Sequence, residues 1–134
     1  MKRRILVVDD DAQIRHALIR ALERQQYEVI SAAGGDSAYA VLSETHVDLV
    51  LLDLVMPQMS GDALFLAIIR RWPALRGRVI LISGDIHSSR DQWPAELKAC
   101  RVLEKPFGLA ELYRAVELAL IEEELPPFQQ TSNA

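Results

Sequence analysis

The sequence predicts one α/β domain in which helices cover both faces of a five-stranded parallel sheet. Two observations lead to this prediction. Short runs rich in Val, Ile and Leu recur along the 134 residues, and amphipathic helical patterns separate them. Runs without polar alternation suit strands that are buried on both faces of a parallel sheet. Right-handed crossovers connect such alternating strands and helices, which gives a doubly wound sheet.

The five strands are expected in the apolar runs along the chain. Three runs are strongly apolar and one is weaker, and they span residues 5–8, 47–52, 79–82 and 27–32, the last being the weaker one. The fifth run, residues 101–104, is short and half polar, as an edge strand would be.

Apolar residues at helical spacing predict helices after the first, second, third and fifth strands. Their expected buried faces consist of Ile14, Ala17, Leu18, Ala21 and Leu22; Ala38, Val41 and Leu42; Leu64, Ile68 and Ile69; and Leu109, Leu112, Val116, Ala119 and Leu120. A turn and a helix cap are expected at residues 34–37, and Pro73 is expected to end the third helix. Residues 85–94 are polar, poorly periodic and include Pro94, so we expect the fourth helix to be short, shifted or mobile.

The composition limits the classes of function. The formal net charge of −4 lacks the positive footprint of a nucleic-acid-binding domain. Cys100 is the single cysteine, so an internal disulfide is excluded and a reducing compartment is expected. The apolar run before Asp9 is too short for a signal peptide or a membrane span, which predicts a cytoplasmic protein.

We expect one domain over residues 1–124 and a flexible tail over residues 125–134.

Acidic residues follow two of the predicted strands. Asp9, Asp10 and Asp11 come directly after the first strand, and Asp53 comes directly after the third. In a sheet ordered 2-1-3-4-5 these strands are neighbours, and the functional crevice lies beyond their carboxyl ends. Closely spaced carboxylates resist joint ionisation, so a hard divalent cation such as Mg²⁺ is expected there. For Asp11, a helix cap is the favoured interpretation.

Two further strand ends bring polar groups to the same edge. Ser83 and Gly84 follow the fourth strand, and Lys105 follows the fifth. An aspartate nucleophile, a metal, a hydroxyl and an ammonium group together suit the transfer of a phosphoryl group, which mainly requires positioning and charge neutralisation.

This ordered set resembles the receiver domains of bacterial two-component response regulators. The similar motifs lie at residues 5–11, at residues 53–57 with Gly61, at residues 83–84 and at residues 105–107, and the resemblance covers residues 3 to about 122. It implies a flavodoxin-like (βα)5 sheet in the order 2-1-3-4-5. It also implies a phosphorelay module of a two-component regulatory system.

The resemblance implies a role for each matching residue. Asp53 would accept a phosphoryl group from the phosphohistidine of a sensor histidine kinase or a phosphotransfer protein. Asp10, Asp53 and the Val55 main-chain carbonyl would bind Mg²⁺, and Asp9 would act through metal-bound water.

The remaining matches concern the phosphoryl group itself. Ser83 and Lys105 would each contact one of its oxygens. The Lys105–Pro106 peptide would be cis, since proline lowers the cost of that isomer. Val55 and Asp85 match positions that tune self-dephosphorylation.

Phosphorylation in this family changes protein contacts, so a downstream protein target is expected, and a homodimer through the face of the last two helices is one option. Family members commonly carry an aromatic switch residue three positions before the lysine, where this chain has Val102. The usual route from Ser83 to the output face is therefore missing.

Met1 shortly before the first strand favours a natural N-terminus. Both a stand-alone regulator and the receiver of a larger regulator or hybrid kinase stay open.

Two alternatives belong to other classes. A phosphatase of the haloacid-dehalogenase type also uses an aspartate nucleophile with Mg²⁺, but its nucleophile follows the first strand in a D-x-D pattern, whereas Asp53 follows the third. A flavodoxin-like cofactor binder would need a hydroxyl-rich phosphate loop after the first strand, where the three acids would repel a phosphate.

Overall fold

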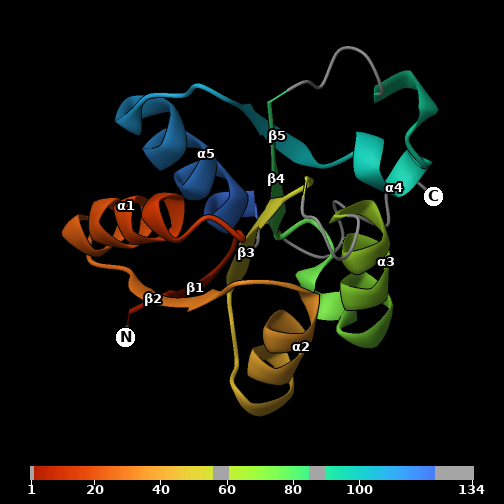
Figure 1. The fold of residues 1–134 in the computed structure, drawn as a ribbon, viewed down its shortest axis with the longest axis horizontal. Helices are drawn as coiled ribbons and strands as arrows, with labels where there is room; N and C mark the ends of the chain where they lie inside the picture. Colours follow the sequence, from red (N-terminus) through yellow and green to blue (C-terminus); the bar gives the residue numbers. More distant parts are fainter. Residues whose placement is uncertain (1, 56–60, 85–89, 123–134) are drawn as a thin grey trace.

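The computed structural model of the chain describes residues 2–55, 61–84 and 90–122. Strands and helices alternate along these ranges (Figure 1). The elements are β1 (Arg4–Val8), α1 (Ala12–Arg24), β2 (Glu28–Ala32), α2 (Gly35–Glu44), β3 (Leu49–Asp53), α3 (Gly61–Arg71), η1 (Pro73–Leu75), β4 (Val79–Ser83), η2 (Arg90–Gln92), α4 (Ala95–Lys98), β5 (Arg101–Glu104) and α5 (Leu109–Glu122). The predictions for Asp85 and for the tail 125–134 lie outside the described residues, as do residues 56 and 57 of the motif at 53–57.

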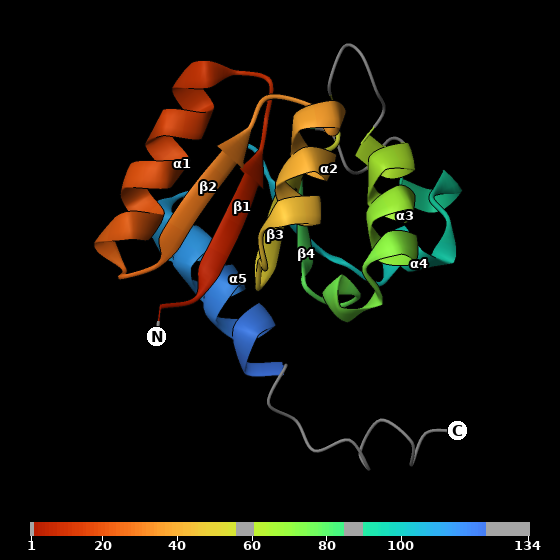
Figure 2. The same ribbon diagram turned by 90° about the horizontal axis from the view of Figure 1, so that it is seen from below.

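The five strands form one parallel sheet in the order β2-β1-β3-β4-β5, which confirms the predicted fold class. The register pairs Val8 with Leu52 and Leu52 with Leu81, so the carboxyl ends of the central strands are level. Ser83, the last residue of β4, pairs with Glu104, the last residue of β5. The residues that follow these strands therefore meet at one edge of the sheet, toward which the strand arrows run in Figure 2.

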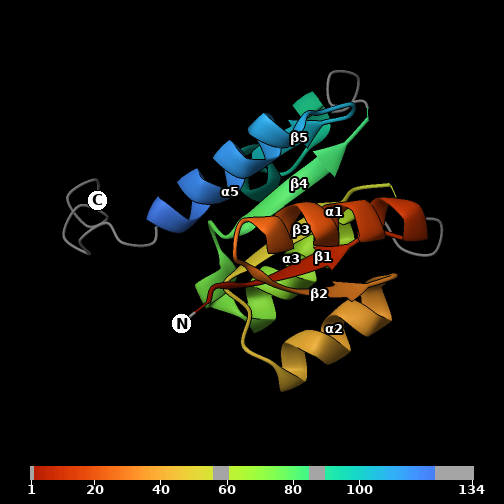
Figure 3. The same ribbon diagram turned by 90° about the vertical axis from the view of Figure 1, so that its left-hand side faces the viewer.

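Helices α1 and α5 lie on one face of the sheet, and α2, α3 and α4 lie on the other (Figures 2 and 3). Successive strand side chains point to opposite faces, so alternate residues enter separate cores. Leu6, Val50 and Leu81 pack under α2, α3 and α4, whereas their neighbours on the same strands pack under α1 and α5. Because both faces are covered, the central strands are apolar throughout, and each fully buried Leu or Ile stabilises the fold by roughly 1.5–3 kcal/mol.

Some strand boundaries and buried helix faces differ slightly between the prediction and the structure. β2 begins at Glu28 instead of residue 27, and β3 begins at Leu49 instead of residue 47. Ala17 and Leu109 are exposed, although both were expected on buried helix faces. Leu109 is the first residue of α5. Ala17 shows that helical spacing alone does not fix the width of the buried stripe.

Helix α4 is short and shifted, as the polar segment before it predicts. It has four residues and begins directly after Pro94, which occupies the N-cap position. No helix within the described ranges is long and apolar enough to cross a bilayer.

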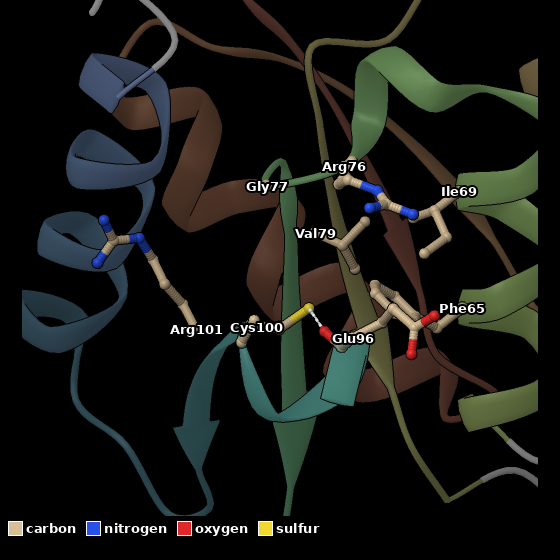
Figure 4. A pocket seen from close by; sticks show the side chains of 9 residues that line it. Phe65, Ile69, Arg76, Gly77, Val79, Glu96, Cys100 and Arg101 are labelled. Atoms are coloured by element: carbon tan, nitrogen blue, oxygen red, sulfur yellow. Dashed lines mark hydrogen bonds between the residues drawn. The ribbon is translucent and has the colours of Figure 1, made fainter. Parts of the chain in front are cut away.

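A cavity of about 370 Å³ lies between α3 and α4, near the beginning of β4 (Figure 4). Phe65 and Ile69 of α3 line one side, and Cys100 lies opposite, with its Sγ donating a 3.4 Å hydrogen bond to the Glu96 carbonyl oxygen. Burial raises the pKa of the Cys100 thiol to about 11, so the thiol stays protonated and inert at neutral pH, as expected for a packing residue. This cavity is at the opposite edge of the sheet from the acidic residues.

Candidate functional site

Polar side chains gather where the strands end. Asp9 follows β1, Asp53 ends β3, Ser83 ends β4 and Lys105 follows β5. Carboxylate oxygens of Asp9, Asp10 and Asp53 all lie within 4.8 Å of one another. The predicted acidic cluster therefore exists, and it brings together residues from the ends of β1 and β3.

The turn between β1 and α1 is held by its own aspartates. One carboxylate oxygen of Asp9 accepts the Asp11 N–H at 2.9 Å. Asp11 caps α1 by accepting the N–H groups of Gln13 and Ile14, at 2.8 and 3.3 Å, which confirms its predicted role. The Arg15 guanidinium donates to the Asp9 carbonyl oxygen at 2.7 Å, a contact that no sequence pattern predicted.

Asp53 is fixed at the end of β3 by the chain that follows it. Its side chain is buried, and one carboxylate oxygen accepts the Val55 N–H at 3.0 Å. The start of α3 returns against the same backbone, because the Gly61 N–H donates to the Leu54 carbonyl at 3.1 Å. A Cβ added to Gly61 would lie 2.4 Å from the Leu54 Cα, so only glycine allows this approach. The Val55 side chain itself is exposed.

Lys105 brings a cation to the acidic cluster. Its Nζ lies 3.7 Å from a carboxylate oxygen of Asp53 and 3.9 Å from one of Asp9. Its main-chain N–H donates to the Ser83 carbonyl at 2.8 Å, which ties the loop after β5 to the end of β4. The Lys105–Pro106 peptide is cis, as the sequence resemblance implied.

The electrostatics of the cluster favour an added cation. Burial raises the pKa of the Asp9 carboxyl, and the nearby negative charges of Asp53 and Asp10 also raise it, while the Asp11 N–H and Lys105 oppose the rise. The second carboxylate oxygen of Asp9 is buried and has no hydrogen-bond partner among the described residues. Within the part of the chain that the structure describes, three carboxylates face one ammonium group, so the edge has an excess of acidic groups.

The donor set fits Mg²⁺. Oxygens bound to one Mg²⁺ at about 2.1 Å lie at most about 4.2 Å apart. Carboxylates within 4.8 Å of one another therefore need only a small inward movement, or a bridging water at one of them, to share an ion.

A groove of about 460 Å³ opens beside this cluster. Ser83 and Gly84 line it together with Trp93 and Leu97. Ser83 is buried at the end of β4, the strand next to the one that carries Asp53. Val102 is half-buried and packs against the core beneath α2, α3 and α4, where the family commonly has an aromatic side chain.

Comparison with known proteins identifies the family of the chain. The sequence profile of the response regulator receiver domain matches residues 5–117. The chain belongs to this family. The match covers well over half of the chain, and the parallel sheet in the order β2-β1-β3-β4-β5 is the fold expected for such a domain.

Relatives of this receiver domain include both short and long proteins. The response regulator receiver protein CpdR of Brucella abortus is 34% identical over 119 residues, which are 89% of this chain and 98% of CpdR. The transcriptional regulatory protein KdpE of Mycobacterium tuberculosis is 35% identical over 116 residues, which are 87% of this chain but 50% of KdpE. The chain thus spans about half or less of the length of the transcriptional regulators that it matches.

Solved receiver structures share the fold. A CheY-like receiver domain protein from Methanospirillum hungatei is 27% identical, with a TM-score of 0.83 over 92% of this chain and 98% of that one. The response regulator TrrA of Thermotoga maritima, solved in complex with Mg²⁺ and BeF, is 31% identical, with a TM-score of 0.76 over 88% of this chain and 99% of that one. The phosphatase alternative receives no support, because the family match is to receivers.

Proposed function

We propose that Asp53 of this receiver domain accepts a phosphoryl group from the phosphohistidine of a sensor histidine kinase or a phosphotransfer protein. One observation carries the proposal: the buried Asp53 carboxylate lies at the end of a central strand and is faced by two other carboxylates and an ammonium group. A carboxylate oxygen of Asp53 would attack phosphorus, and the bond from phosphorus to the imidazole nitrogen of the donor would break.

The neighbouring residues supply charge and orientation. Asp10, Asp53 and the Val55 carbonyl would hold Mg²⁺, with Asp9 acting through a water molecule, and the ion would neutralise charge on the phosphoryl oxygens. Lys105 would pair with one phosphoryl oxygen, and Ser83 would donate to another. The proximity of Lys105 to Asp53, 3.7 Å, supports its part of this assignment.

Phosphorylation would change the contacts of the domain with other proteins. A phosphoryl group adds about −1.5 to −2 charge at neutral pH. Drawing Ser83 and Lys105 toward that charge would shift the ends of β4 and β5 and the groove beside them. A downstream protein target, or a second copy of the domain, would read this shift in the cytoplasm. The domain would act on itself and would turn over no separate substrate.

The test is phosphorylation by a small donor. Wild-type protein with Mg²⁺ and acetyl phosphate should gain one phosphoryl group by intact mass, and Asp53→Asn should gain none. Asp62→Asn is the matched control, because Asp62 is an exposed acid in the first turn of α3 and lies near the same edge. Its labelling should equal that of the wild type.

Two outcomes would contradict the proposal. Equal labelling of wild type and Asp53→Asn would place the acceptor elsewhere. Repeated hydrolysis of an added phosphomonoester would indicate a phosphatase instead of a signalling domain.

A further inference from the structure

Arg15 occupies an unusual place for a basic residue. It lies in the first turn of α1, a turn without any acidic residue, where a positive charge opposes the helix dipole. Its side chain is half-buried and folds back across the turn, so that Nη1 donates to the Asp9 carbonyl oxygen at 2.7 Å. Helix stability does not explain this position, whereas the short, charge-assisted hydrogen bond does.

The Asp9 carbonyl belongs to the peptide group that joins Asp9 to Asp10. The Asp9 N–H donates to the Ala32 carbonyl at 3.2 Å, which holds the other side of Asp9 against β2. Asp10 is exposed, so packing does little to orient its carboxylate. The direction in which that carboxylate leaves the backbone therefore depends on the peptide plane that Arg15 holds.

Geometry, more than charge, links Arg15 to the acids. Arg15 contacts the main chain of the turn, so its effect on the cluster runs through the position of the backbone.

We propose that Arg15 is a positioning residue of the metal site. Its hydrogen bond holds the peptide between Asp9 and Asp10 so that both carboxylates face Asp53. The inference rests on the proposed function only for the identity of the metal, Mg²⁺.

The experiment measures Mg²⁺ binding to the unphosphorylated protein by following amide NMR signals of the folded state. Arg15→Met removes the donor and keeps the apolar stem, and it should raise the Kd for Mg²⁺ about tenfold, as is typical when a group that orients a metal ligand is lost. Arg15→Lys keeps one donor and the charge, and it should stay within about threefold of the wild type by the same comparison.

Arg20→Met is the matched control. Arg20 is an exposed arginine on the same helix, so the control removes the same charge away from the turn. Its Kd should equal the wild-type value or fall slightly, because removing a positive charge favours cation binding.

The direction of the change in the Kd for Mg²⁺ distinguishes a positioning role of Arg15 from a purely electrostatic effect of its charge. An unchanged or tighter Kd in Arg15→Met would overturn the proposal, since loss of charge alone tightens Mg²⁺ binding. Binding by Arg15→Lys that is as weak as that of Arg15→Met would also overturn it.

The readout counts only folded molecules, so a loss of stability cannot imitate the effect. If Arg15→Met does not fold, Arg15→Gln, with its shorter side chain, should weaken binding in the same direction. Failure of Asp53 labelling would leave these metal affinities measurable, so the two proposals can fail separately.

Discussion

Asp48 shows how one residue can join three strands at the edge opposite the acidic cluster. Its side chain accepts the Arg4 N–H at 2.8 Å at the beginning of β1 and contacts the exposed His46 ring at 3.0 Å. Its carbonyl oxygen accepts a hydrogen bond from the Arg78 guanidinium at 3.0 Å, just before β4. Burial would raise the pKa of the Asp48 carboxyl, but the Arg4 N–H and His46 outweigh burial and hold that pKa below its usual range.

This lowered pKa predicts a pH dependence of stability. The stability from ionised Asp48 is fully present above its unfolded pKa of about 3.9 and is lost as the pH falls through the lower folded value. At pH 5, Asp48→Asn should be less stable than the wild type by about 1 kcal/mol, and the difference should shrink by pH 3. Urea unfolding in Mg²⁺-free buffer at both pH values measures it. A difference that stays constant would show that Asp48 does not titrate with folding.

Single residues differ in how far the sequence reveals their roles. The positions of Asp9, Asp53 and Lys105 at one edge follow from strand ends, because parallel strands place their carboxyl ends together. The Arg15 contact does not follow from any spacing rule, since a long side chain that returns to a main-chain carbonyl depends on its rotamer. The family resemblance predicts which residues bind the metal, but it does not predict the contacts that orient those residues.

At the scale of elements, the junction of β3 and α3 positions Asp53, the proposed acceptor. A Cβ on Gly61 would lie 2.4 Å from the Leu54 Cα and 2.8 Å from the Asp53 carbonyl oxygen. Both are backbone atoms, which cannot move aside as a flexible side chain could. The close packing of α3 on the end of β3 therefore depends on glycine at this position.

Gly61→Ala should push α3 away from β3. We expect a loss of about 1–3 kcal/mol in the free energy of unfolding, as is usual for overpacking, together with slower labelling of Asp53 by acetyl phosphate. Chemical denaturation and intact mass measure the two effects. Gly34→Ala is the control, because a Cβ there meets nothing within 4 Å. Its effect should be limited to the weaker N-cap of α2, and an equal loss in both variants would refute the steric explanation.

The elements themselves were predicted to different extents. The central strands were located well, because a strand buried on both faces requires a continuous apolar run. The weak fourth helix was also expected from Pro94 and the polar residues before it. The exposed Ala17 was not, since alanine suits both buried and exposed helix positions and carries little information about its side.

At the scale of the whole molecule, a bound ion at the acidic edge should couple to global stability. Mg²⁺ binds a site that the unfolded chain lacks, so at ten times its Kd it should add roughly 1.4 kcal/mol, or a few degrees in Tm. Calorimetry with and without Mg²⁺ measures this shift. Asp10→Ala should show none, and without Mg²⁺ its Tm should be at least that of the wild type because one repelling charge is gone. Equal shifts in both proteins would place the ion elsewhere.

At the same scale, the proposed input and output of the signal lie in different parts of the fold. The proposed input groups meet at one edge of the sheet, because parallel strands place their carboxyl ends together. The output would depend on which surface moves on phosphorylation, and the position where the resemblance implied an aromatic switch residue is occupied by Val102.

The short α4 has a consequence for local unfolding. Four helical residues span about 6 Å, while the five residues of β4 beneath them span about 17 Å. The edge strand β5, whose Arg101 and Val102 are only half-buried, thus has a short helical cover on this face of the sheet. Its amides should lose hydrogen-exchange protection through openings that cost less free energy than global unfolding. A shift of Lys105 toward a phosphoryl group would then act beside a strand that opens more readily than the fully buried central strands.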